Sequence, residues 1–119
     1  MRDKIIAVIL AIFALSSCQK TFNVSSVRFS KDGGTQIIEV NGYDLWIYDR
    51  NGEYESVDEY DETTGVYRTT VGWLCVEKTI SDSQVTVTAT RNDSGKRRTL
   101  YLEAMNANVS TSIPVIQER

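Results

Sequence analysis

The sequence predicts an all-β protein, an antiparallel β-sandwich of about seven strands with an extra acidic β-hairpin inserted between them. Three observations support this fold class. Short segments with apolar residues at every second position recur along the chain, turn-forming residues separate them, and no helical periodicity follows Leu15. About 100 residues follow that point, which is the usual length of one sandwich domain.

Residues 1–17 have the features of a signal peptide. Two basic residues precede an apolar run over residues 5–15, which is well short of the about 20 residues needed to cross a bilayer. The sequence Leu15-Ser16-Ser17-Cys18 resembles a bacterial lipobox, in which the cysteine is lipidated and becomes the mature N-terminus. This resemblance implies lipid attachment at Cys18 and a short tether over residues 18–23. The alternative is an ordinary secretory signal with a chance cysteine.

The sandwich domain is expected to span residues 24–117. Its first two strands are predicted at residues 24–29 and 35–40. A Gly33-Gly34 turn joins them, because residues without a side chain tolerate the backbone angles of a tight turn.

The third strand is predicted from Leu45 to Arg50, ending in a hairpin turn at Asn51-Gly52. Both turn residues tolerate the positive φ of a type I′ turn. This register places Trp46 opposite Val57 on the returning strand.

The inserted segment is predicted to span about residues 49–67 and to contain a second hairpin. The loop of that hairpin is expected at residues 61–65, with Asp58 opposite Arg68.

The next strand, residues 72–77, carries Trp73 and Cys75. We expect Trp73 and Trp46 to fill the core of the sandwich. Cys75 is expected to be a buried free thiol that packs as a small apolar residue, because the chain has no histidine to activate it as a nucleophile.

The segment from Gln84 to Ala104 is predicted to be a β-hairpin with a polar turn at residues 91–96. Arg98 shares the inward parity of its strand and is expected to bond loop carbonyls at the rim. Pro114 lacks an amide proton, so the last strand should lie at a sheet edge or enter a bulge. The residues expected to face inward are Val85, Val87, Ala89, Leu100, Leu102 and Ala104.

Five short motifs follow one another along the predicted domain. They are Phe29-Ser30-Lys31-Asp32-Gly33-Gly34-Thr35-Gln36, Asn41-Gly42-Tyr43-Asp44-Leu45-Trp46, Trp73-Leu74-Cys75-Val76, Val85-Thr86-Val87-Thr88-Ala89-Thr90 with Asn92 and Arg98, and Ile113-Pro114-Val115-Ile116-Gln117. In this order they resemble BACON domains, immunoglobulin-like modules of Bacteroidetes named for a presumed role in carbohydrate binding. The resemblance implies an immunoglobulin-like sandwich and a glycan as ligand.

Charge and composition argue against two classes of function. The formal charge is −3, and −4 from Cys18 onward, which excludes nucleic acid as an expected partner. Histidine, the commonest general base and metal ligand, is absent. We therefore expect a protein that is not an enzyme and needs no cofactor.

The segment from Asp44 to Glu62 contains eight acidic residues and one basic residue, Arg50. Closely spaced carboxylates suit Ca²⁺, but the full alternating ligand set of a calcium loop is missing. We favour a solvated, charged hairpin that keeps a sheet edge soluble, and we predict no metal site.

Four tyrosines within or beside this segment are the candidate glycan-binding residues: Tyr48, Tyr54, Tyr60 and Tyr67. Sugar rings stack their C–H faces on aromatic rings, while neighbouring carboxylates accept hydrogen bonds from hydroxyl groups. The alternative is that some of these rings belong to the core.

The predicted function is that of a non-catalytic envelope lipoprotein with a carbohydrate-binding module. The alternative is a structural or docking subunit of an outer-membrane protein complex with no ligand of its own. A hydrolase with paired carboxylates is not expected, because acids on an exposed ribbon lack the cleft that raises one pKa. The residues after Cys18 favour the periplasmic side of the outer membrane over the cell surface.

Overall fold

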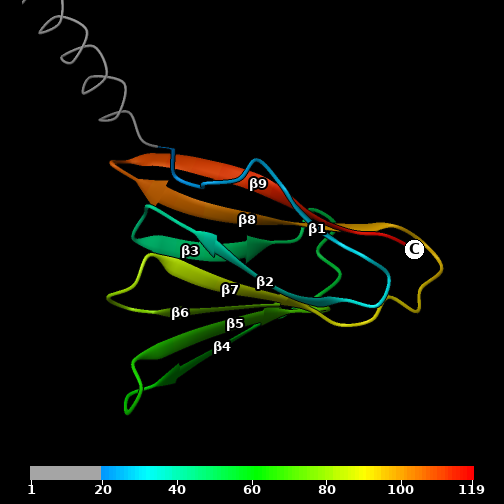
Figure 1. The fold of residues 1–119 in the computed structure, drawn as a ribbon, viewed down its shortest axis with the longest axis horizontal. Helices are drawn as coiled ribbons and strands as arrows, with labels where there is room; N and C mark the ends of the chain where they lie inside the picture. The colour runs from blue at the N-terminus through cyan, green and yellow to red at the C-terminus, as the bar shows by residue number, and fades with distance from the viewer. Residues whose placement is uncertain (1–19) are drawn as a thin grey trace, which may run out of the picture.

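The computed structural model describes residues 20–119, which form nine strands and no helix (Figure 1). The strands are β1 (Val27–Phe29), β2 (Gly34–Glu39), β3 (Asp44–Tyr48), β4 (Ser56–Asp61), β5 (Val66–Val71), β6 (Leu74–Thr79), β7 (Gln84–Ala89), β8 (Arg98–Asn106) and β9 (Val109–Gln117). The predicted all-β fold is confirmed.

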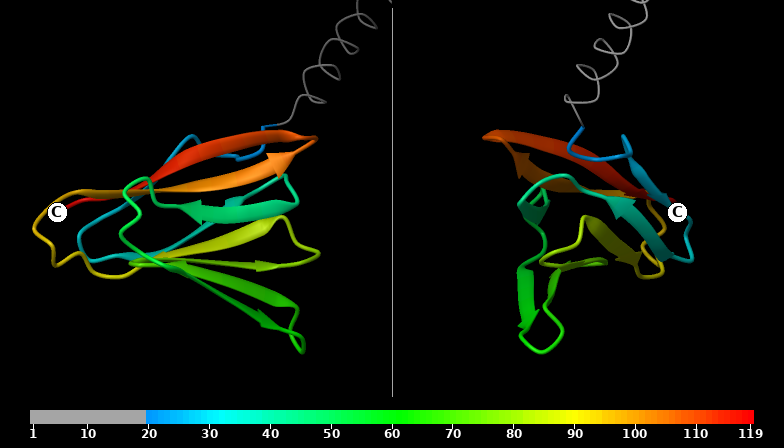
Figure 2. Two further views of the ribbon diagram at one scale, coloured as in Figure 1. Left: turned by 180° about the vertical axis from the view of Figure 1, so that it is seen from behind. Right: turned by 60° about the vertical axis from the view of Figure 1, so that its left-hand side comes forward.

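The strands form two sheets that pack face to face (Figure 2). One sheet has four strands in the order β1-β9-β8-β3, and the other has five in the order β2-β7-β6-β5-β4. All neighbouring strands are antiparallel except β1 and β9. This is the predicted sandwich.

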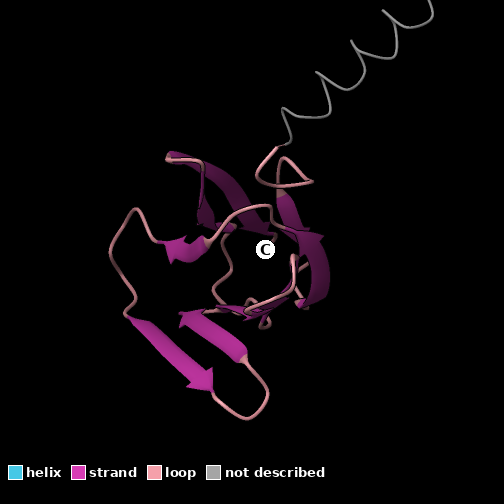
Figure 3. Cartoon of the chain, turned by 90° about the vertical axis from the view of Figure 1, so that its left-hand side faces the viewer, coloured by secondary structure: helices cyan, strands magenta, loops and turns pink. Residues whose placement is uncertain are grey.

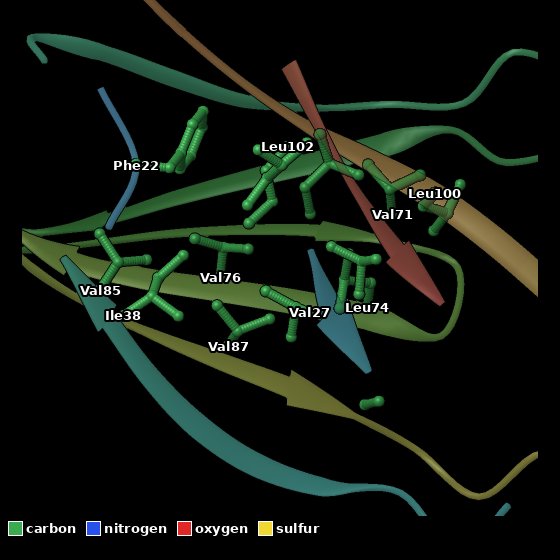
Figure 4. Close-up of a cluster of buried hydrophobic side chains, with 14 of the residues drawn as sticks. Phe22, Val27, Ile38, Val71, Leu74, Val76, Val85, Val87, Leu100 and Leu102 are labelled. Atoms are coloured by element: carbon green, nitrogen blue, oxygen red, sulfur yellow. The ribbon is translucent and has the colours of Figure 1, made fainter. Parts of the chain in front are cut away.

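The core lies between the sheets and follows from the alternation of the strands (Figure 4). Each strand with one apolar face turns that face toward the other sheet, so the alternate polar residues point to solvent. The predicted inward residues are all buried: Val85, Val87, Ala89, Leu100, Leu102 and Ala104.

The predicted hairpin from Gln84 to Ala104 is wrong, because β7 and β8 belong to different sheets. β7 pairs with β2 and β6, whereas β8 pairs with β3 and β9. A hairpin would place both apolar faces on one side of one sheet. In the structure, the apolar faces of β7 and β8 belong to opposite sheets and both point into the core between them.

The loop between β7 and β8 is held by side-chain bonds to the backbone. Arg98 Nη2 donates to the carbonyl oxygens of Thr90 at 3.4 Å and Arg91 at 3.2 Å, so its predicted role at the rim is confirmed. Burial lowers the pKa of Arg98, but an arginine stays charged.

The predicted hairpin at Asn51-Gly52 is also wrong. β3 lies in the four-stranded sheet and β4 in the five-stranded sheet, so the chain crosses between the sheets there, and Trp46 does not pair with Val57. The Asp49 carboxylate stabilises this crossing by accepting hydrogen bonds from three backbone amides.

The second predicted hairpin is present as β4 and β5, with its register shifted by one residue. Glu59 lies opposite Arg68, and Asp58 lies opposite Thr69. The loop follows Asp61, whose carboxylate accepts the amides of Thr63 and Thr64, and these bonds lower the pKa of Asp61. The hairpin therefore joins the five-stranded sheet as its edge.

The two tryptophans differ in position. Trp73 is 5% exposed, as predicted. Trp46 is not a core residue: it is half-buried on the outer face of the four-stranded sheet, where its Nε1 donates to Glu103 Oε2 at 2.7 Å. The neighbouring residue Ile47 takes the inward position on β3. Cys75 is a free thiol but only half-buried.

The structure also places the first described residues and the last strand. Thr21 and Phe22, expected in the tether, are buried, and Phe22 forms an isolated bridge with Val40. The predicted signal peptide and Cys18 lie outside the described residues. The last strand, β9, is not an edge strand as predicted, because it lies between β1 and β8. Pro114 itself precedes the first β1 pair at Val115, so it lies where β9 has no β1 partner.

Candidate functional site: an aromatic cleft

A cleft of about 600 Å³ lies between β3 and the inward faces of β5 and β6. It forms because the β4–β5 hairpin extends beyond the rest of the sandwich (Figure 3), so its inward face has no opposing sheet. All six residues of β4 are exposed as a result. The lining residues are Tyr43, Asp44, Leu45, Trp46, Ile47, Tyr67, Thr69, Val76, Lys78, Ile80 and Met105.

Strand pairing aligns three side chains, two of which line one wall of this cleft while the third lies beside it. Tyr60 on β4 lies opposite Tyr67 on β5, and Tyr67 lies opposite Lys78 on β6. Directly paired residues point to the same face of a sheet, so the three side chains form a row. The ring centroids of Tyr60 and Tyr67 are 6.1 Å apart with an angle of 43° between the planes. Both rings are nearly half exposed, at 48% and 43%.

The opposite wall comes from β3 and the residues before it. Tyr43 is exposed and precedes Asp44, the first residue of β3. The amide of Tyr43 donates to the carbonyl oxygen of Met105 at 3.1 Å, which fixes the start of β3 against β8. Ile80, at the end of β6, is also exposed and contributes an apolar contact surface.

The four candidate tyrosines do not form one platform. Tyr67 lines the cleft and Tyr60 lies beside it, whereas Tyr48 and Tyr54 lie elsewhere. Tyr48 is opposite Tyr101 on β8, on the outer face of β3, and is not among the residues that line the cleft. The Arg50 guanidinium stacks on the ring of Tyr101, 3.9 Å from its centroid.

Tyr54 lies where the chain crosses between the sheets, and its ring packs against the backbone there. Its ring covers Gly72, where a Cβ atom would lie 2.7 Å from the ring, and Gly72 has a φ of +55°. Only glycine fits both the close contact and the backbone conformation at this position.

Sequence reasoning missed Tyr43, Lys78 and Ile80 as members of the site. One signal for Lys78 was available: it shares the parity of Leu74 and Val76, so alternation places a cation on the core face of β6. No pattern in the sequence predicted that Tyr43 belongs to the site. Its position depends on β3 being the edge strand of its sheet.

The acidic residues of the insertion do not gather around one point. Among residues 20–119, no group of three carboxylate or thiol side chains is placed to hold a metal ion. Asp49 and Asp61 instead bond backbone amides of their own loops. The same part of the chain has no helix long and apolar enough to span a membrane.

One comparison, with a solved structure, supports the fold. No protein family model matches the sequence, and no curated protein matches it. An NMR structure of a protein from Bacteroides thetaiotaomicron is similar, with 19% identity, a TM-score of 0.51, and coverage of 86% of this chain and 80% of the other. A Bacteroides ovatus GH5 xyloglucanase in complex with a XXXG heptasaccharide has 18% identity and a TM-score of 0.45 over 79% of this chain and 17% of the other.

Proposed function

We propose that this protein is a non-catalytic envelope lipoprotein that binds a glycan in the cleft between β3 and the β4–β5 hairpin. The observation that carries the proposal is a pair of exposed tyrosines: Tyr67 lines an open cleft, and Tyr60 is paired with it on the next strand, beside the cleft. Aromatic rings of this kind stack on the apolar faces of sugar rings. The resemblance of the sequence to BACON domains favours the same ligand class.

The cleft also has a suitable size and chemistry. Its volume of about 600 Å³ lies within the about 300–1,000 Å³ common for small-ligand sites. Its walls are largely aromatic and apolar, with Asp44, Thr69 and Lys78 as polar groups. Such groups can orient a ligand by bonding its hydroxyls.

The arrangement of acids supports binding without catalysis. A glycosidase needs two carboxyl groups on opposite sides of the scissile bond, one of them in apolar surroundings that raise its pKa. Asp44 and Asp58, on the two sides of the cleft, are both exposed to solvent. We therefore propose recognition of the glycan rather than its hydrolysis.

Replacing Tyr67 with alanine should weaken glycan binding by about 1 kcal/mol or more, because the stacking surface is lost. Tyr60→Ala should have an effect in the same direction. A glycan array identifies the ligand, and calorimetry on the full chain in detergent measures the change. Tyr48→Ala is the matched control, since this tyrosine is equally exposed but lies outside the cleft. A loss in Tyr48→Ala with none in Tyr67→Ala would place binding on the outer face.

Replacing Cys18 with serine should release the protein from the membrane, because the serine hydroxyl cannot accept the thioether-linked lipid. We expect the parent to incorporate radiolabelled palmitate and partition with detergent, and the variant to do neither. Cys75→Ser is the control, since that thiol is half-buried on β6. Unchanged labelling of Cys18→Ser would refute lipidation at this residue, and with it the proposed outer-membrane location facing the periplasm.

A docking subunit is the second candidate, favoured by the free edge of β4. This strand is the last in its sheet and is exposed along its whole length. An open edge can accept a strand from a partner protein. Photocross-linking from Val57 in intact cells tests this candidate: a single envelope protein captured there, with an empty glycan array, would favour docking.

A further inference from the structure

We infer that the ligand of the cleft is an anionic glycan whose carboxylate or sulfate group pairs with Lys78, an inference that rests on the glycan-binding function proposed above. It comes from the surroundings of Lys78, which differ from those of Arg68, the other basic residue on the strands of the same sheet.

Lys78 points inward at the inner end of the cleft. It lies opposite Tyr67 on β5 and Val85 on β7, and it is half-buried. Its Nζ donates to the carbonyl oxygen of Ile80 at 3.5 Å, the outer limit of a hydrogen bond. Within residues 20–119, no carboxylate lies within 4.0 Å of this ammonium group.

Arg68, on the outer face of the same sheet, shows the contrast. Its guanidinium is 3.1 Å from Glu77 and 3.4 Å from Glu59, so the outward cation has two partners. Lys78 has no carboxylate partner among residues 20–119, although the chain carries a net negative charge. A cation that is partly removed from water without a counter-charge is unfavourable, and an anionic ligand group restores that interaction.

The row of side chains gives the ligand a direction. A sugar ring stacked on Tyr67 lies next to Lys78 on one side and next to Tyr60 on the other. Asp58 shares the face of Tyr60, and Asp44 lies on the opposite wall. A carboxylate accepts bonds from hydroxyls but repels an anion, so Asp58 beside Tyr60 favours the Lys78 end of the row for the charged group of the ligand.

Two matched pairs of probes test this inference on the full chain in detergent. The first pair is an oligogalacturonate and its methyl ester, and the second is a sulfated galactan oligosaccharide and its desulfated form. Within each pair the sugar backbone is the same, and only one member carries the anionic groups. We expect the parent to bind the charged member of one pair at least about tenfold more tightly, as one charge-assisted hydrogen bond implies. The pair that shows the preference identifies the anion.

The variants assign the preference to a residue. Lys78→Met should abolish the preference for the charged member of the pair, and Lys78→Arg should restore part of it. Lys96→Met is the control, because Lys96 is exposed in the loop between β7 and β8. A parent that binds uncharged glycans as tightly as charged ones would overturn the anionic ligand but keep the proposed function. A parent that binds no glycan at all would overturn both.

Discussion

Replacing Trp73 with alanine should destabilise the protein by about 3 to 5 kcal/mol, the usual cost of removing a large aromatic side chain from a core. Trp73 is 5% exposed and follows Gly72 in the tight turn between β5 and β6. The guanidinium of Arg98 covers its ring at 4.8 Å, so the change removes a cation–π contact as well as core packing. Small domains have a total stability of about 5–15 kcal/mol, and the variant should therefore be close to unfolding.

Trp46→Ala is the matched comparison, because it removes the same side chain from a half-buried site. It should cost about 1 to 2 kcal/mol, from partial burial and the bond to Glu103. Urea denaturation followed by circular dichroism measures both variants. An equal loss of unfolding free energy in the two variants would contradict the conclusion that Trp73 is a core residue and Trp46 is not.

Alternation along the strands predicted which side chains face inward, but not which strands pair. The burial of Val85, Val87, Leu100 and Leu102 agrees with the period of two. That period is the same whether two successive strands form a hairpin or lie in opposite sheets. The sequence therefore predicted both faces correctly while the pairing of β7 with β8 was wrong.

The turn at Asn51-Gly52 shows a related limit of local reasoning. A type I′ turn needs a positive φ at both residues, but only Gly52 has one, at +62°. A positive φ at the glycine alone serves a crossing between sheets when a side chain such as Asp49 holds the amides. Which structure forms is decided by where the apolar faces of β3 and β4 find partners, and that is a property of the whole chain.

The candidate site was predictable only in part, because one of its walls is a local structure and the other depends on long-range strand pairing. Tyr60 and Tyr67 come together because the β4–β5 hairpin is a local structure, and the sequence predicted that hairpin. The other wall comes from β3, whose place in space depends on its pairing with β8. Without knowledge of that long-range pairing, the sequence could not predict that Tyr43 and Lys78 lie near Tyr60 and Tyr67.

Replacing Gln117 with leucine should cost about 3 kcal/mol or more, because it leaves several buried polar groups without partners. Gln117 is fully buried at the end of β9. Its Nε2 donates to the carbonyl oxygens of Thr90 at 2.7 Å and Ser30 at 3.1 Å, and its Oε1 accepts Arg98 Nε at 2.8 Å. These bonds join the loop after β1 to the loop after β7, and so connect the two sheets at one end of the sandwich.

The loss should come from the unpaired groups and not from leucine itself, whose volume is close to that of glutamine. Gln84→Leu makes the same exchange at an exposed position on β7 and should change stability by less than about 0.5 kcal/mol. Asn92→Leu should act like Gln117→Leu, because the buried Asn92 amide donates to the carbonyl oxygens of Lys96 and Glu118 in the same region. Thermal unfolding of all three variants measures the difference. A melting temperature for Gln117→Leu equal to that of Gln84→Leu would mean that water replaces these bonds and that the buried network contributes little to holding the sheets together.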